Sequence, residues 1–166
     1  MGYSDRELYG VGGWLTFFLV TLGVISPLVS IGSVLMMTSD SATAGALGDA
    51  WDTAVRIEWT IVVIVCLAMW FAVYRFLMVR NWTTVVIGIS VIWLVASVTL
   101  IVEPLIVAGL LGLPLVQLYG AMGATLVRPL IYAGIWTAYL LKSERVANTY
   151  RYPERGDEEA LAEVFD

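Results

Sequence analysis

The chain has 166 residues, 60% of them hydrophobic and 14% charged, and its formal net charge is -5. A soluble domain carries about 25% charged residues, so this composition argues against one. The lack of histidine removes the commonest general base and transition-metal ligand. A single cysteine, Cys66, excludes internal disulfides and cysteine-based zinc sites. The acidic balance also argues against nucleic-acid binding.

Four apolar runs fill most of the chain, each close to the roughly 20 residues that cross a hydrocarbon core. They cover residues 14–37, 57–79, 83–102 and 120–141. We therefore expect an all-α fold, a four-transmembrane-helix bundle. The bundle would form one domain over residues 1–152, and an acidic cytoplasmic tail would follow over residues 153–166.

The stretch between the third and fourth runs has a different character. Glu103 and Pro104 close the third run, and residues 105–118 are apolar but contain Gly109, Gly112 and Pro114. This stretch is too short and too interrupted for a further span. It predicts a short interfacial or re-entrant segment between helices three and four.

Basic residues collect on one side of this threading, as the positive-inside rule describes for cytoplasmic loops. Those on the first side are Arg6, Arg75, Arg80, Lys142, Arg145, Arg151 and Arg155. The opposite loops hold only Arg56, among the acidic residues Asp40, Asp49, Asp52, Glu58 and Glu103. The pattern predicts that both termini are cytoplasmic.

Arg128 is the one basic residue deep inside a predicted span, since Arg75 lies close to the cytoplasmic end of its span. It lies thirteen residues before Leu141, which at 1.5 Å per residue is roughly 20 Å from the cytoplasmic boundary. An arginine at this depth normally faces the bundle interior with a partner, here Glu103 or Glu58. Two interpretations stay open: an ion or substrate site, or a structural ion pair or snorkelling arginine.

Pro27 lies mid-way along the first run and removes a backbone donor there. Ser26 and Ser30 lie on nearby faces, so their hydroxyls are candidates to satisfy the freed carbonyls. In the last run, small residues such as Ala133, Gly134 and Ala138 favour close packing on a neighbouring helix.

Two short motifs carry a resemblance. Gly12-Gly13-Trp14-Leu15 opens the first run, and a closing motif after Trp136 and Tyr139-Leu140 contains Ser143, Arg145, Val146, Thr149 and Tyr150. The chain thereby resembles DUF2569, a bacterial membrane family of unknown function, over about residues 10–150. An arginine inside the last span, here Arg128, also resembles the family pattern. The resemblance implies a bacterial inner-membrane protein with four helices, and it implies no activity.

No cluster of residues predicts catalysis, a metal site or a bound cofactor. We expect a non-enzymatic inner-membrane protein, an accessory or interaction subunit that packs on a larger membrane complex or on itself. Its predicted partners are the lipid bilayer and another membrane protein or a second copy. The alternative is a small transporter or channel component with a charged site around Arg128.

Overall fold

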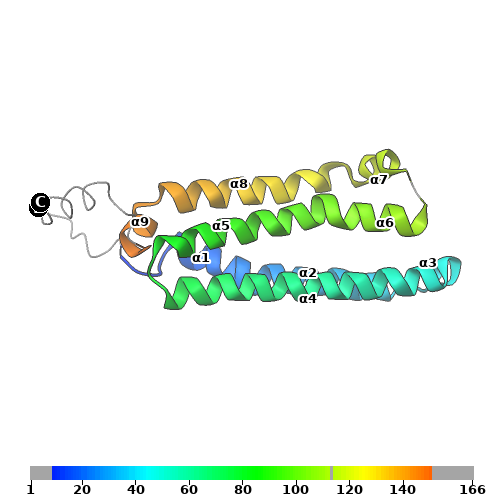
Figure 1. Cartoon of the computed structure of the whole chain (residues 1–166), viewed down its shortest axis with the longest axis horizontal. Coiled ribbons are helices and arrows are strands. Elements are labelled where there is room, and N and C mark those ends of the chain that lie inside the picture. The colour runs from blue at the N-terminus through cyan, green and yellow to red at the C-terminus, as the bar shows by residue number, and fades with distance from the viewer. Residues whose placement is uncertain (1–8, 113, 151–166) are drawn as a thin grey trace, which may run out of the picture.

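The computed structural model describes residues 9–112 and 114–150 as a long helical bundle, with no strand among them (Figure 1). The acidic tail and three of the predicted cytoplasmic arginines, Arg6, Arg151 and Arg155, lie outside these residues. In chain order the elements are α1 (Trp14–Val20), η2 (Thr21–Ile25), α2 (Ser26–Thr38), α3 (Ser41–Leu47), α4 (Asp49–Met78), α5 (Trp82–Ser97), η3 (Val98–Val102), α6 (Glu103–Leu111), α7 (Leu115–Met122), η4 (Gly123–Leu126), α8 (Val127–Lys142) and α9 (Glu144–Tyr150). The all-α prediction is confirmed over the described residues.

Three continuous helices in this part of the chain are long and apolar enough to cross a membrane. They are Trp14–Thr38, Asp49–Met78 and Trp82–Leu110. Only 28–33% of their most apolar windows is buried inside the molecule, and much of the rest is large exposed apolar side chains. A surface of this kind is rare on soluble monomers, so the three helices indicate a membrane-embedded protein.

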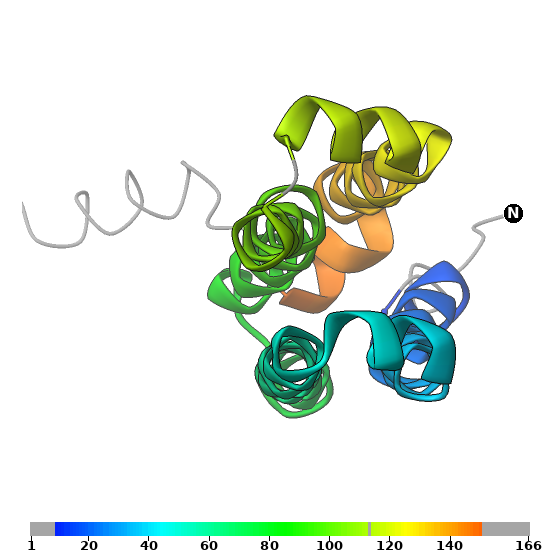
Figure 2. The same ribbon diagram turned by 90° about the vertical axis from the view of Figure 1, so that its right-hand side faces the viewer.

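The helices pack in a simple order. Helix α4 packs against α2 and α5, and α5 packs against α8. Seen end-on, the first and last helices face each other across the remaining side, and α9 crosses the far end of the bundle (Figure 2). Both ends of the described chain lie at this far end, because the Gly10 backbone N–H donates to Thr149 Oγ1 at 2.8 Å.

The helices differ from the predicted runs at three boundaries. The second helix starts at Asp49, eight residues before the predicted run at residue 57. The third helix does not end at Glu103-Pro104 but continues as α6 to Leu111, so the first part of the predicted interfacial segment extends that helix. Chain reversal occurs later, at Gly112, and the separate helix α7 follows. The fourth helix does not start at residue 120, because Gly123 ends α7 with a φ of +45°, a conformation that favours glycine. Helix α8 then has 16 residues.

The third helix continues past Pro104, and the first helix continues past Pro27, and the same local structure permits both. A proline inside a helix clashes with the carbonyl four residues earlier and gives it no hydrogen. In both places a five-residue π-helix, η2 or η3, lies directly before the residue that precedes the proline and widens the turn. The two carbonyls concerned, those of Gly23 and Leu100, accept hydrogen bonds from the Trp70 indole and the Tyr119 hydroxyl, each at 2.9 Å.

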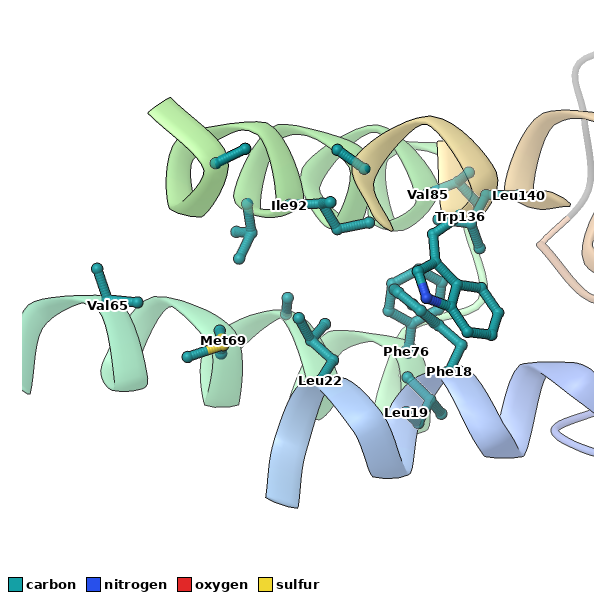
Figure 3. Close-up of a cluster of buried hydrophobic side chains, with 14 of the residues drawn as sticks. Phe18, Leu19, Leu22, Val65, Met69, Phe76, Val85, Ile92, Trp136 and Leu140 are labelled. Atoms are coloured by element: carbon teal, nitrogen blue, oxygen red, sulfur yellow. The ribbon is translucent and has the colours of Figure 1, made fainter. Parts of the chain in front are cut away.

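Toward the α9 end of the core, the rings of Phe18, Phe76 and Trp136 lie together (Figure 3). Phe18 of α1 contacts Trp136 of α8 and Phe76 of α4, with ring centroids 5.0 and 5.6 Å apart. Phe76 in turn meets Tyr150 of α9 at 5.3 Å. We call these four residues the aromatic cluster. It joins the first, second and last helices to α9, while the opposite half of the bundle packs through smaller side chains.

Candidate functional site

A cavity of about 360 Å³ lies between the first helix, α5 and α8, in the half of the bundle away from α9. This volume is within the usual range for small-molecule sites. Its described lining residues are Leu22, Ile25, Ser26, Val29, Ser30, Met69, Ile92, Val95, Ala96, Thr99, Arg128, Pro129 and Tyr132. The wall is mostly apolar, and the polar groups on it come from three different helices.

Arg128 is the only charged side chain among these described lining residues. It occupies the second position of α8, where the chain leaves the 3₁₀ turn η4, and it is an exposed residue. Fourteen residues separate it from Lys142 at the other end of α8, which corresponds to about 21 Å along the helix. A guanidinium therefore stands at the rim of an apolar chamber, well away from the basic end of the molecule.

The predicted carboxylate partners lie elsewhere. Within residues 9–112 and 114–150, Arg128 forms no ion pair with either Glu103 or Glu58. Glu58 on α4 and Glu103 at the start of α6 lie instead on two helices that pack against each other. Neither of them lines the cavity.

Three hydroxyls of the cavity wall are also unsatisfied. Those of Ser26, Ser30 and Thr99 have no hydrogen-bond partner among the described residues, and all three side chains are half-buried. The sequence predicted that Ser26 and Ser30 would bond the carbonyls freed by Pro27, but Trp70 bonds the Gly23 carbonyl. A half-buried hydroxyl without a partner loses free energy unless water or a ligand bonds it. The cavity thus offers three hydroxyl groups and one guanidinium to a bound molecule.

A second hollow adjoins the cavity on the side toward α9. It is a groove of about 520 Å³ between α1 and α8, and we call it the aromatic groove. It is lined by Trp14, Phe17, Thr21, Tyr132, Ile135, Trp136 and Tyr139. Tyr132 lines both hollows, and its hydroxyl donates to Thr21 Oγ1 at 3.3 Å. The aromatic groove has hardly any polar surface, in contrast to the cavity.

The closing sequence motif forms a cap across the α9 end of the bundle. Val146, Thr149 and Tyr150 are fully buried, and the Ser143 hydroxyl accepts a long hydrogen bond, 3.4 Å, from the Val146 N–H at the start of α9. The Tyr150 hydroxyl donates to the Phe76 carbonyl at 2.6 Å, one of the last four of α4, which have no partner within the helix. These motif residues therefore have a packing role.

The opening motif meets this cap. Gly13 begins α1 with a φ of +57°, and Trp14 is the exposed first residue of that helix. Arg145 of α9 lies over Gly12, so close that a Cβ on this glycine would be 3.0 Å from Arg145 Nη1. The two segments are more than 130 residues apart in the chain, and the fold brings them into contact.

The motifs and their contacts lie within a single family match. The model of a protein family of unknown function, DUF2569, matches residues 8–151, which include α1, α9 and everything between them. The chain belongs to DUF2569. The resemblance proposed from the sequence is thereby confirmed, and the match assigns no activity. No curated protein and no solved structure matches the chain.

Sequence reasoning singled out Arg128 but missed most of the site around it. Ser30 and Thr99 are ordinary polar residues in apolar runs, and nothing local indicates that they face one chamber. Tyr132 is one helical turn after Arg128, so a search of the same helix face would have found it. No group of three or more carboxylate or cysteine side chains able to hold a metal occurs among the described residues.

Proposed function

We propose that this chain is a small non-enzymatic membrane protein that binds an anion with an apolar substituent in the Arg128 cavity, as a transporter or channel component would. The observation that carries the proposal is a guanidinium beside three hydroxyls on an otherwise apolar wall, all four without a partner among the described residues. A guanidinium at the rim of such a cavity favours an oxyanion, since it bonds two oxygens at once. The apolar wall favours a ligand that is not a simple inorganic ion.

Binding fits the cavity better than catalysis does. Its described lining residues include no carboxylate and no cysteine, and the chain has no histidine, so a general base is lacking among them.

The accessory role in a larger membrane complex, and packing of the chain on itself, stay predictions. Ala133 is used inside the bundle, whereas Gly134 and Ala138 lie exposed on α8, where a partner helix would meet them.

Four crossings with both termini cytoplasmic form the proposed topology in a bacterial inner membrane. Support comes from Arg75, Arg80, Lys142 and Arg145, all at the α9 end of the bundle, and from α8, which packs along α5 (Figure 1). A cytoplasm-active reporter fused after Asp166 is expected to be active, and a periplasm-active reporter inserted at Gly48, between α3 and α4, likewise. A C-terminal fusion active only in the periplasm contradicts this topology.

Removing the guanidinium is expected to abolish anion binding. Arg128→Gln keeps a polar side chain but loses the charge, and charge-assisted hydrogen bonds contribute about 1.5–3 kcal/mol, or roughly tenfold to more than a hundredfold in affinity. Butyl phosphate serves as the probe. We expect it to raise the melting temperature of the wild-type protein in nonionic detergent, since a ligand that binds only the folded state stabilises it. In Arg128→Gln the shift is expected to vanish.

Two further variants test whether the shift in melting temperature depends on the guanidinium of Arg128. Arg56→Gln removes an exposed arginine of α4 that does not line the cavity, and it should keep the full shift. Arg128→Lys retains the charge without the planar five-donor fork, and it should keep the fold but lose most of the shift. Equal shifts in the wild type, Arg128→Gln and Arg56→Gln contradict the proposed function.

A further inference from the structure

We infer that the ligand of the Arg128 cavity carries one long apolar chain, and that this chain lies in the aromatic groove between α1 and α8. The inference rests on the proposed function, because the anionic head is the group that Arg128 holds. It adds the class of ligand, which is a single-chain amphiphile that enters sideways from the bilayer. A small water-soluble anion is thereby distinguished from a membrane-soluble one.

The cavity and the aromatic groove differ in polarity, so each suits a different part of an amphiphilic ligand. The cavity holds the guanidinium of Arg128 and the unsatisfied hydroxyls, whereas the aromatic groove is lined almost wholly by rings and aliphatic carbon. Tyr132 is the residue common to both, so its ring lies at the boundary between the two hollows. A head group in the cavity with an attached chain would find its apolar surface beyond this ring.

The combined length of the cavity and the groove suits such a chain. Arg128 and Tyr139 mark the two ends on α8, and eleven residues of helix correspond to about 16 Å. One leaflet contributes about 15 Å of hydrocarbon, which is the length that a lipid chain fills. The distance from the charge to the far end of the groove therefore matches an acyl-sized chain.

The groove is open to its surroundings along this length. Trp14, Phe17 and Ile135 are each at least half exposed, although all three line the groove. In the proposed topology these side chains face lipid, so a chain can enter between α1 and α8 without passing through water. A lipid chain gains little free energy by moving from the bilayer into an apolar groove. Selectivity for the anionic amphiphile must therefore come from the charge at Arg128.

Photolabelling tests where the chain lies. The probes are butyl phosphate and dodecyl phosphate, each with a diazirine at the end of the chain, added to the full-length protein in nanodiscs of neutral lipid. We expect the short probe to label cavity residues such as Ile92, and the long probe to label groove residues such as Ile135 and Trp136. Arg128→Gln should lose both patterns, since neither head group is then held.

A variant that fills the groove distinguishes binding of the apolar chain there from binding of the anion in the cavity. Ile135→Trp occupies the groove and should lose labelling by the dodecyl probe while the butyl probe still labels the cavity. Ile131→Trp is the matched control, because Ile131 is an exposed isoleucine of the same helix outside both hollows, and it should keep both patterns. If the dodecyl probe labels every lipid-facing helix evenly while the butyl probe still labels the cavity, the inference fails and the proposed function stands. If neither probe labels the cavity, both fail.

Discussion

Gly88→Ala is expected to destabilise the protein strongly, although alanine is the better helix former. Gly88 lies on α5 directly against the ring of Phe76, and an added Cβ would lie 2.7 Å from the Phe76 Cζ atom. That ring has no room to move, because it is fully buried between Phe18 and Tyr150. Overpacking of this kind costs about 1–3 kcal/mol, occasionally more. The measurement is thermal unfolding in nonionic detergent.

Gly134→Ala supplies the control for this prediction. Gly134 is also a helical glycine, on α8, but nothing lies within 4 Å of the position of its Cβ. Without a clash, alanine should stabilise the helix by about 0.5–1 kcal/mol through the lower entropy of the unfolded chain. A double-mutant cycle with Phe76→Leu should show strong coupling to Gly88→Ala, because the smaller side chain relieves the contact. Equal effects of the two alanine substitutions would show that Phe76 does not define the α4–α5 contact.

The apolar periodicity and length of the runs were sufficient to predict the helices, but not where they bend. Span ends near Trp14, Val79 and Trp82 were placed within a residue or two of those in the structure. The prediction ended the third span before Glu103-Pro104, because the apolar stretch that follows is short and interrupted by Gly109, Gly112 and Pro114. What allows the helix to continue is a tertiary contact, the Tyr119 hydroxyl on the Leu100 carbonyl, and no local pattern encodes it.

The same limit applies to the candidate site. The free-energy cost of an arginine in the hydrocarbon predicts that Arg128 does not face lipid alone. Glu103 was the expected partner because a short connection joins the third span to the fourth. The structure places Glu58 and Glu103 on the packed helices α4 and α6 and puts Arg128 at the rim of a cavity. The helices pack in the order α2–α4–α5–α8, and this order decides which side chains face each other. The sequence of a single chain does not specify the order. The motif of α9 could be recognised from the sequence, but its burial against α4 could not.

Tyr150→Ala is expected to detach α9 from the bundle. The ring is fully buried in the aromatic cluster, lies 5.8 Å from the Arg80 guanidinium carbon, and its hydroxyl bonds the Phe76 carbonyl. Removal of a buried aromatic ring costs about 3–5 kcal/mol, whereas Tyr150→Phe loses only the hydrogen bond, about 0.5–1.5 kcal/mol. Tyr74→Ala, which truncates an exposed tyrosine of α4, should change the unfolding temperature little. Similar losses in Tyr74→Ala and Tyr150→Ala would contradict a cap held by Tyr150.

The pH dependence of the same residue gives an independent measurement. Burial raises the pKa of Tyr150 to about 12, against the opposing effect of the Arg80 charge. In the unfolded chain a tyrosine ionises near pH 10, so the neutral, hydrogen-bonded form stabilises the fold fully below that pH. This stabilisation should be lost as the pH rises from about 10 through about 12, because the unfolded state releases its proton first. Tyr150→Phe has no proton to lose, so its deficit relative to the wild type should shrink over this range. Parallel unfolding curves for the two proteins up to pH 12 would mean that the Tyr150 hydroxyl is not buried against α4.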